Sequence, residues 1–250
     1  MSTPSATVID ATPQPRLGTF ARITGIFFNP KETFKDIAEA PTWIIPVVLL
    51  LVLSTIACVA LNQRMDWRGY ISQQIEKSPQ AANLSPEQKE QRIEGGVKMA
   101  PMFAYIFGIP AAVIAVLVVA AVMLGAYNLF GGAGANFSQA MGIVSHVFLV
   151  TIVSTAIFLL VLFIKPVGSF DLENPVATNI GVLVPEDAAK WLQTLGKSID
   201  IFSFWMLILI AIGFAAVNPR KLKFGQSFAI VLGVWAVFVL VKVTWAWIFA

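Results

Sequence analysis

The chain has 250 residues, of which 57% are hydrophobic and 12% charged, and its net charge is +3. Soluble globular domains carry about 25% charged residues, so this composition excludes an ordinary soluble domain and indicates a membrane protein. The small positive charge is spread along the chain, which argues against a nucleic-acid partner. A single cysteine and a single histidine exclude a disulfide framework and a Cys/His metal cluster.

The N-terminal region divides into a polar tail and an amphipathic stretch. Residues 1–19 are rich in Pro, Ser, Thr and Ala and are expected to form a disordered cytoplasmic tail. An interfacial helix capped by Asn29 is predicted next, lying in the headgroup layer beside the first span. Its defining residues are Pro30 at the first helical position and the apolar Phe34 and Ile37. It is either a structural collar or a partner-binding helix.

Five apolar segments are long enough to cross a bilayer, which takes about 20 residues. They are residues 42–62, 101–129, 138–164, 200–217 and 226–249. The predicted fold is therefore an all-α integral membrane protein with five transmembrane helices and short interfacial helices. These elements form one membrane domain over residues 20–250.

The longest uncharged run covers 66 residues, from Met99 to Ile164. As one helix it would be about 100 Å long, some three times a hydrocarbon core of about 30 Å, so it must double back. A Gly-rich turn between residues 131 and 136 is the predicted point of reversal, with Gly131, Gly132 and Gly134 in it. The second and third spans then form a helical hairpin.

Short helices are predicted in both longer loops. Ser85 and Gln88 have the spacing of a capping box and start a polar helix, which we expect to end at Gly95–Gly96. Pro185 begins a second, amphipathic helix, which we expect to end at Gly196.

Lys and Arg in short loops predict the orientation of the spans. The last loop holds three basic residues and no acid, Arg220, Lys221 and Lys223. This places that loop, the Gly-rich turn and the N-terminus in the cytoplasm and the C-terminus outside. The loop between the first two spans carries six basic residues and would then lie outside, so it disagrees and leaves the opposite orientation open.

His146 is the one histidine and lies within the predicted third span. An ionisable group is costly there and is a functional candidate for that reason. Small residues precede it at every fourth position, which is typical of closely packed helices. The stripe consists of Gly134, Ser138, Gly142 and His146. The imidazole is either a proton-sensitive or ligand-contacting group, or a neutral side chain bonded within a packing seam.

Catalytic patterns are missing from the sequence. The predicted spans hold no pair of carboxylates, and the chain has no HExxH motif or Walker loop. Ser138 and Ser145 lie on the same predicted helix as His146, which is a poor arrangement for a nucleophile and its base. The chain is therefore not expected to be an enzyme or to hold a metal or cofactor.

A family resemblance is carried by the segment from Phe27 to Ile37, which reads FFNPKETFKDI, followed by Pro41 and Pro46. It resembles the motif before the first span in the bacterial branch of the Yip family, named for Ypt/Rab-interacting proteins. The Gly-rich turn followed by Phe137 is a second point of resemblance.

The resemblance covers residues 20–248 and implies a five-span protein of the bacterial inner membrane with a cytoplasmic N-terminus. Eukaryotic members act in vesicle traffic and bind Rab GTPases and one another. Their Asp-Leu-Tyr-Gly-Pro motif is replaced here by residues Glu39–Trp43, which makes Rab-type GTPase binding doubtful for this chain.

Two functions follow as hypotheses. The first is a non-catalytic protein that acts by association within the lipid bilayer, either with other membrane proteins or with a second copy of itself. The second is a transporter, or an accessory subunit of one, with a polar cavity near His146.

Overall fold

The computed structural model describes residues 16–167, 170, 172, 174–185 and 187–249. In these residues the regular structure is helical, and the one extended pairing is an isolated bridge between Asn179 and Asp200. The predicted all-α class is therefore confirmed. Residues 1–15 of the predicted tail lie outside the described residues.

The chain begins with two short helices and a long one. α1 spans Thr19–Phe28, α2 spans Pro30–Glu39 and α3 spans Ile44–Arg64. Pro30 is the first residue of α2. The N–H of a first helical residue has no acceptor within the helix, so proline, which lacks this N–H, loses no hydrogen bond there. The Asn29 side chain does not cap α2, so this detail of the prediction is wrong.

α5 is a single helix of 46 residues over Pro86–Gly131, about 70 Å long. The short helix α4 (Trp67–Lys77) and the 3-10 turn η1 (Pro79–Asn83) precede it. The predicted capping box is present: the Ser85 Oγ atom accepts from the Gln88 N–H at 3.2 Å, and the Gln88 Oε1 atom accepts from the Ser85 N–H at 2.9 Å.

The predicted helix end at Gly95–Gly96 is wrong, because α5 continues through both glycines into the second span. Gly96 lies against α4, where a Cβ atom would be 2.9 Å from the Ile71 Cγ2 atom. The glycine here permits close packing of α4 on α5 instead of ending a helix.

The third span consists of α6 (Phe137–Val147), a 3-10 segment η2 (Phe148–Val150) and α7 (Thr151–Ile164). The interruption begins at Phe148, two residues after His146. A 3-10 segment inside a long helix often marks strain or a hinge.

The loop between α7 and the last two helices contains η3 (Ile180–Leu183) and α8 (Lys190–Ser198). α8 starts five residues after Pro185 and continues past Gly196, so both predicted ends of this helix are wrong. Gly196 lies against η3, where a Cβ atom would be 2.9 Å from the Gly181 Cα atom.

Two apolar helices complete the chain, α9 (Ile201–Val217) and α10 (Phe224–Ile248). Among the described residues, four helical segments are long and apolar enough to cross a membrane: α3, α5, α6 to α7 taken together, and α10. α9 is apolar but has 17 residues, about 25 Å, which is at the lower limit for a span. The Asp200 carboxylate caps its N-terminus by accepting from the Phe202 N–H at 2.9 Å.

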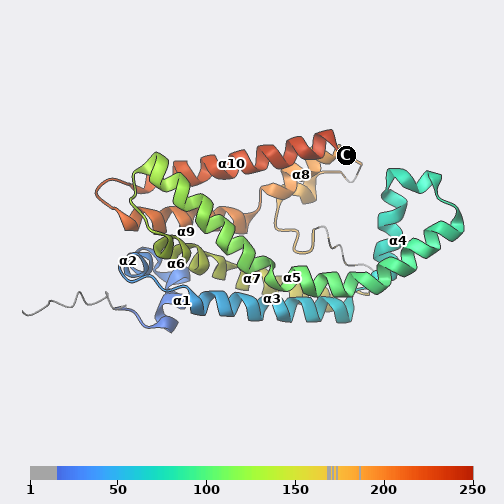
Figure 1. Cartoon of the computed structure of the whole chain (residues 1–250), viewed down its shortest axis with the longest axis horizontal. Coiled ribbons are helices and arrows are strands. Elements are labelled where there is room, and N and C mark those ends of the chain that lie inside the picture. Colours follow the sequence, from blue (N-terminus) through green and yellow to red (C-terminus); the bar gives the residue numbers. More distant parts are fainter. Residues whose placement is uncertain (1–15, 168–169, 171, 173, 186, 250) are drawn as a thin grey trace, which may run out of the picture.

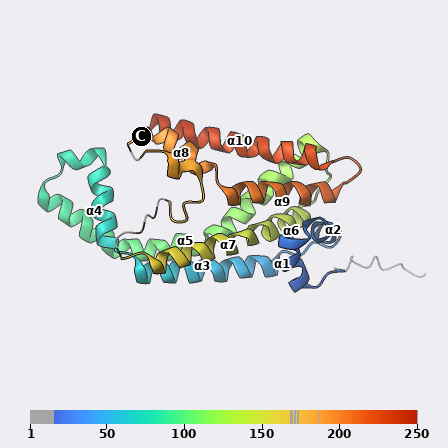
Figure 2. The same ribbon diagram turned by 180° about the vertical axis from the view of Figure 1, so that it is seen from behind.

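The long helices lie roughly along the long axis of the molecule (Figures 1 and 2). α5 runs obliquely through the bundle: it contacts α3 and α4 along its first part and α6 and α10 farther on. Its first turns and α4 project beyond the other helices at one end (Figure 1).

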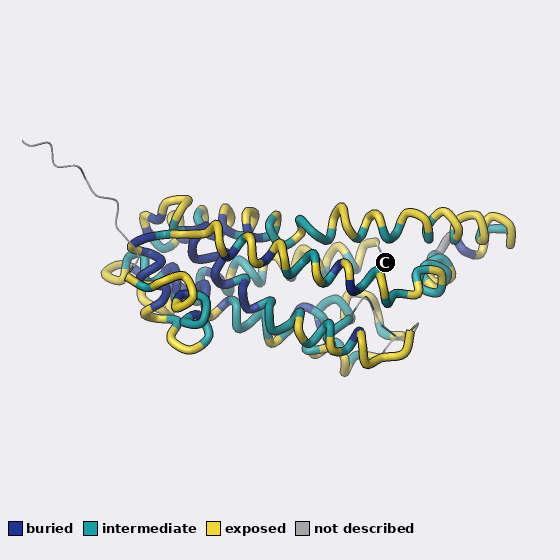
Figure 3. Tube along the Cα trace, turned by 90° about the horizontal axis from the view of Figure 1, so that it is seen from below, coloured by how far each residue is buried: buried dark blue, intermediate teal, exposed yellow. Residues whose placement is uncertain are grey.

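The core is concentrated at the opposite end, where α2, the α5–α6 turn and the α9–α10 turn lie together (Figure 3). Buried residues from α1, α2, α5, α6, α9 and α10 form one apolar cluster. Its members include Ile26, Phe34, Ile37, Tyr127, Ile143, Val144, Phe214 and Val231.

Candidate functional site

Close helix packing in the core occurs where α2, α6 and α9 cross. A Cβ atom on Gly213 of α9 would lie 2.4 Å from the Ile143 Cγ2 atom and 3.2 Å from the Phe34 Cδ1 atom. A Cβ atom on Gly142 of α6 would lie 3.2 Å from the Ile37 Cγ2 atom. Both glycines therefore bring helix backbones against large side chains of their neighbours.

The apolar face of α2 is turned into this crossing. Phe34 and Ile37 are both fully buried. Sequence reasoning places them beside the first span, but α2 packs chiefly against α9 and α6, so this expected neighbour is wrong. The face of α2 that remains exposed carries Lys31, Glu32, Lys35 and Glu39.

His146 lies at the end of α6 with 1% of its surface exposed. Its Nδ1 atom is 2.7 Å from the carbonyl oxygen of Gly142, so the imidazole donates a hydrogen bond to its own helix. Ser145 donates to the same carbonyl at 3.2 Å. These bonds satisfy polar groups that would otherwise be costly in an apolar interior.

The predicted stripe of small residues is divided by the fold. Gly142 and His146 share the buried side of α6, whereas Ser138 is exposed in its first turn. Gly134 is also exposed and belongs to the preceding turn.

A buried ion pair joins α1 to α2 at the same end. Arg22 and Asp36 are 1% and 5% exposed, and their charged groups approach to 2.7 Å. Arg22 also donates to the Ala40 carbonyl at 3.0 Å and to the Thr42 hydroxyl at 2.8 Å, just before the first span. The Asp36 carboxylate accepts a further bond from the Arg16 N–H at 2.8 Å. Such full hydrogen bonding is what allows a charge pair to be buried.

The Gly-rich turn between α5 and α6 lies where the sequence predicts it. Gly132 and Gly134 have φ angles of +56° and +64°, in the left-handed region that glycine adopts without a steric penalty. Asn128 closes the turn: its amide donates to the Ala135 carbonyl at 2.9 Å and accepts from the Ala135 N–H at 2.8 Å.

The α5–α6 turn packs against the α9–α10 turn. A Cβ atom on Gly131 would be 3.1 Å from the Leu222 Cδ1 atom, so the two turns are in close contact. The Asn218 amide donates to the Ala133 carbonyl at 3.4 Å. The two turns thus form one packed unit at this end of the bundle.

A buried polar contact links the three helices next to this unit. The Tyr127 hydroxyl of α5 donates to the Ser227 carbonyl of α10 at 2.8 Å, and the Ser227 Oγ atom donates to the Ala211 carbonyl of α9 at 2.7 Å. The Tyr127 ring stacks on Phe214 with centroids 4.1 Å apart. Hydrogen bonding and stacking together fix the relative position of α5, α9 and α10.

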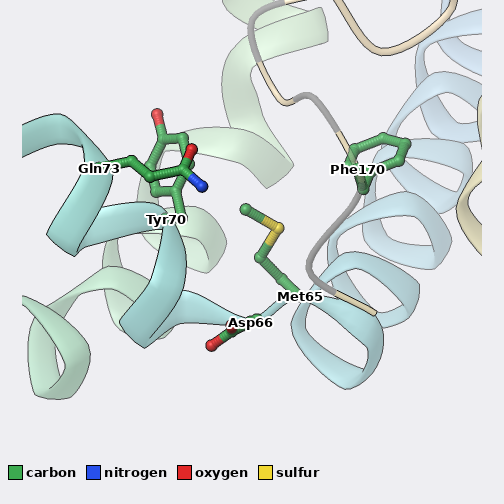
Figure 4. A pocket seen from close by; sticks show the side chains of 5 residues that line it. All are labelled: Met65, Asp66, Tyr70, Gln73 and Phe170. Carbon is green, nitrogen blue, oxygen red and sulfur yellow. The ribbon is translucent and has the colours of Figure 1, made fainter. Parts of the chain in front are cut away.

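Two pockets formed by described residues both lie away from His146. One, of about 20 Å³, has room for about one water molecule. It is lined by Met65, Asp66, Tyr70, Gln73 and Phe170 and lies at the end of the bundle near α4 (Figure 4). A second, open pocket between α8 and α10 is lined by Trp191, Val243, Thr244 and Trp247.

The family model for the Yip1 domain matches residues 24–246. The chain belongs to the Yip1 domain family. It is accordingly a multi-pass membrane protein, and the family suggested by the motif after Phe27 is confirmed. No curated protein matches the chain, and no solved structure matches it.

Several residues of this Yip1 domain escape sequence reasoning although they organise the core: Arg22, Asp36, Gly213, Tyr127 and Ser227. Two signals were present in the sequence. Arg22 is the only charged residue within the apolar segment that becomes α1, and Gly213 interrupts a continuous apolar run. A charge needs a partner in such a segment, and a glycine there marks close packing.

The described core of the Yip1 domain is held together by apolar packing and hydrogen bonds. Within the described residues, no three metal-ligating side chains are grouped to hold an ion. The buried polar side chains described above bond to backbone carbonyls or to one another.

Proposed function

We propose that this Yip1-domain protein is a non-catalytic membrane protein that acts by association within the bilayer, with other membrane proteins or with a second copy of itself. The observation that carries the proposal is the state of His146, which is 1% exposed and bonded to the Gly142 carbonyl at 2.7 Å. His146, the residue best suited to a chemical role, is thus part of the helix packing.

The alternative, a transporter or transporter subunit, requires a polar cavity that reaches His146. The two pockets described above do not include this side chain. Gly142, one turn before His146, and Gly213 are both in tight contact with neighbouring side chains. These contacts favour a packed seam over a pathway.

The surface proposed for association is the exposed part of the α5–α6 turn and the first turn of α6. Gly142 and His146 face the interior, whereas Gly132, Gly134 and Ser138 are exposed. Phe130 and Phe137 flank them and are also exposed. Small residues between exposed aromatic side chains permit close approach of another helix.

We place the protein in the bacterial inner membrane with its N-terminus and both short turns in the cytoplasm and its C-terminus outside. α1, α2 and both short turns lie at one end of the bundle (Figures 1 and 2). The α9–α10 turn at this end carries three basic residues and no acidic residue. The positive-inside rule therefore assigns this end of the bundle to the cytoplasm. At the opposite end basic residues alternate with acids, and Arg68 pairs with Glu90.

A photo-crosslinking amino acid at position 138 tests the proposed surface in native membranes. Association predicts a protein adduct of defined mass on irradiation, and its mass distinguishes a second copy from another membrane protein. The matched control is position 118 on α5, where Val118 is exposed in the middle of a span and should give lipid adducts alone. Lipid adducts alone at both positions would contradict association through this surface.

A further inference from the structure

The α9–α10 turn presents three cations on a rigid frame. Arg220, Lys221 and Lys223 are exposed, whereas Leu222 between them is 2% exposed and packs against Gly131. The Asn218 carbonyl accepts from the Leu222 N–H at 2.9 Å and from the Lys221 N–H at 3.2 Å. The backbone that carries the cations is thus anchored at both ends, which lowers the entropy lost when they bind a ligand.

The charge of this turn is not neutralised within the described chain. No acidic residue occurs after Asp200 in the sequence. The three ion pairs among described residues involve Arg16, Arg22 and Arg68, and none uses a cation of the turn. The N-terminus of α10, at Phe224, adds the positive end of a helix dipole at the same place.

Exposed apolar side chains lie directly beside the cations. Phe224, the first residue of α10, is 48% exposed, and Phe130, at the end of α5, is 72% exposed. Both stand at the ends of helices that span the membrane. Aromatic side chains in this position insert at the boundary between headgroups and acyl chains, and flanking cations then lie at the level of the lipid phosphates.

We propose that the α9–α10 turn, clamped on the α5–α6 turn, is a docking surface for the phosphate groups of anionic membrane lipids. The phosphates contact the three cations of the turn, Arg220, Lys221 and Lys223. The depth of the turn in the headgroup layer is set by the aromatic rings of Phe130 and Phe224. An acidic soluble protein fits less well, because the exposed aromatic rings belong in the bilayer and not at an aqueous contact. The surface shares Phe130 with the proposed association surface, but its three cations belong to the α9–α10 turn, and it does not depend on that association.

The test is native mass spectrometry of the full-length protein, purified in detergent and incubated with phosphatidylglycerol or phosphatidylcholine. The variant is R220Q/K221Q/K223Q. Its matched control is K89Q/R92Q/K98Q, which removes three positive charges from the first part of α5 near the opposite end. Each basic residue adds to the attraction to an anionic surface, so the turn variant, which lacks three, should bind phosphatidylglycerol about 100-fold more weakly.

The proposal predicts that wild-type protein and the control variant retain phosphatidylglycerol in preference to phosphatidylcholine, and that the turn variant loses this preference. Inorganic phosphate added in excess should leave the bound lipid in place, because it lacks the acyl chains that the aromatic rings contact. An equal loss in the control variant would overturn the proposal in favour of net charge alone. Displacement by inorganic phosphate, or equal retention of both lipids by the wild type, would also overturn it.

Discussion

Gly213 of α9 faces Ile143 of α6 so closely that a Cβ atom on the glycine would be 2.4 Å from the Ile143 Cγ2 atom. Real side chains do not pack at that distance, so the crossing of the two helices requires glycine. Glycine has a low helix propensity and lowers the stability of a helix interior. The close approach of α6 explains why a glycine is nevertheless present at this position of α9.

We expect Gly213→Ala to destabilise the protein by about 1–3 kcal/mol, because the added methyl group forces α6 and α9 apart. Unfolding in mixed detergent micelles, followed by circular dichroism, measures the change. Gly233→Ala in α10 is the control, since its Cβ atom would enter open space. It should be neutral or stabilise by up to about 1 kcal/mol. Equal stability of the two variants would contradict the close crossing.

Loss of the Arg22 side chain should be more costly. Arg22→Met leaves the buried Asp36 carboxylate without its cation, and removing one partner of a buried pair costs about 3–5 kcal/mol. The control is Arg16→Met, which removes the exposed ion pair with Glu39 but keeps the backbone bond to Asp36. Exposed pairs contribute about 1 kcal/mol or less. If both variants unfold at the same detergent composition, Arg22 does not anchor α1.

The hydroxyl of Tyr127 should contribute about 1 kcal/mol through its bond to α10. Tyr127→Phe keeps the ring stacked on Phe214 and removes the donor. Tyr105→Phe, on an exposed part of α5, is the matched control and should have no effect. The Ser227 Oγ atom also lies 3.1 Å from the Tyr127 hydroxyl oxygen, so a double-mutant cycle with Ser227→Ala measures the coupling of the two side chains, and strictly additive effects would show that they do not act together.

The left-handed backbone at Gly132 predicts a difference between two substitutions. Gly132→Ala should lose about 1–2 kcal/mol of stability, because its side chain clashes with its own backbone at a φ of +56°. Gly132→Asn should lose less, since asparagine tolerates this region. Gly225→Ala places its Cβ atom in open space without a positive φ, so it should change little. A loss in Gly132→Asn as large as in Gly132→Ala would argue for a different turn.

Hydropathy and local signals predict the parts of the fold that depend on short stretches of chain. The apolar runs become long helices, the Ser85 capping box starts α5, and the Gly-rich turn reverses the chain before Phe137. The end predicted at Gly95–Gly96 fails because a tertiary contact with Ile71 overrides the weak helix propensity of glycine.

The candidate site was less accessible to sequence reasoning because it depends on which helices meet. The sequence singles out His146 as an ionisable group within a span and Gly142 by its spacing from it, and the structure places both in the core. Arg22 stands out in the sequence as the one charge in an apolar segment, but Asp36 resembles an ordinary surface charge, and the two lie on separate helices. Their pairing follows from the fold of α1 against α2, which no local pattern predicts.

The topology depends on whether α9, with its 17 residues, crosses the bilayer. If α9 crosses, the α5–α6 turn and the α9–α10 turn lie on the same side of the membrane. Cysteine labelling measures the topology directly. Cys58, the one cysteine, is replaced with serine, and single cysteines are introduced in turn as Ser138→Cys, Lys221→Cys and Gln73→Cys. Labelling with a membrane-impermeant maleimide in intact and opened cells then reports the side of each position. Five spans predict that Ser138→Cys and Lys221→Cys react only in opened cells and Gln73→Cys in intact cells. Labelling of Lys221→Cys from the same side as Gln73→Cys would contradict the proposed topology.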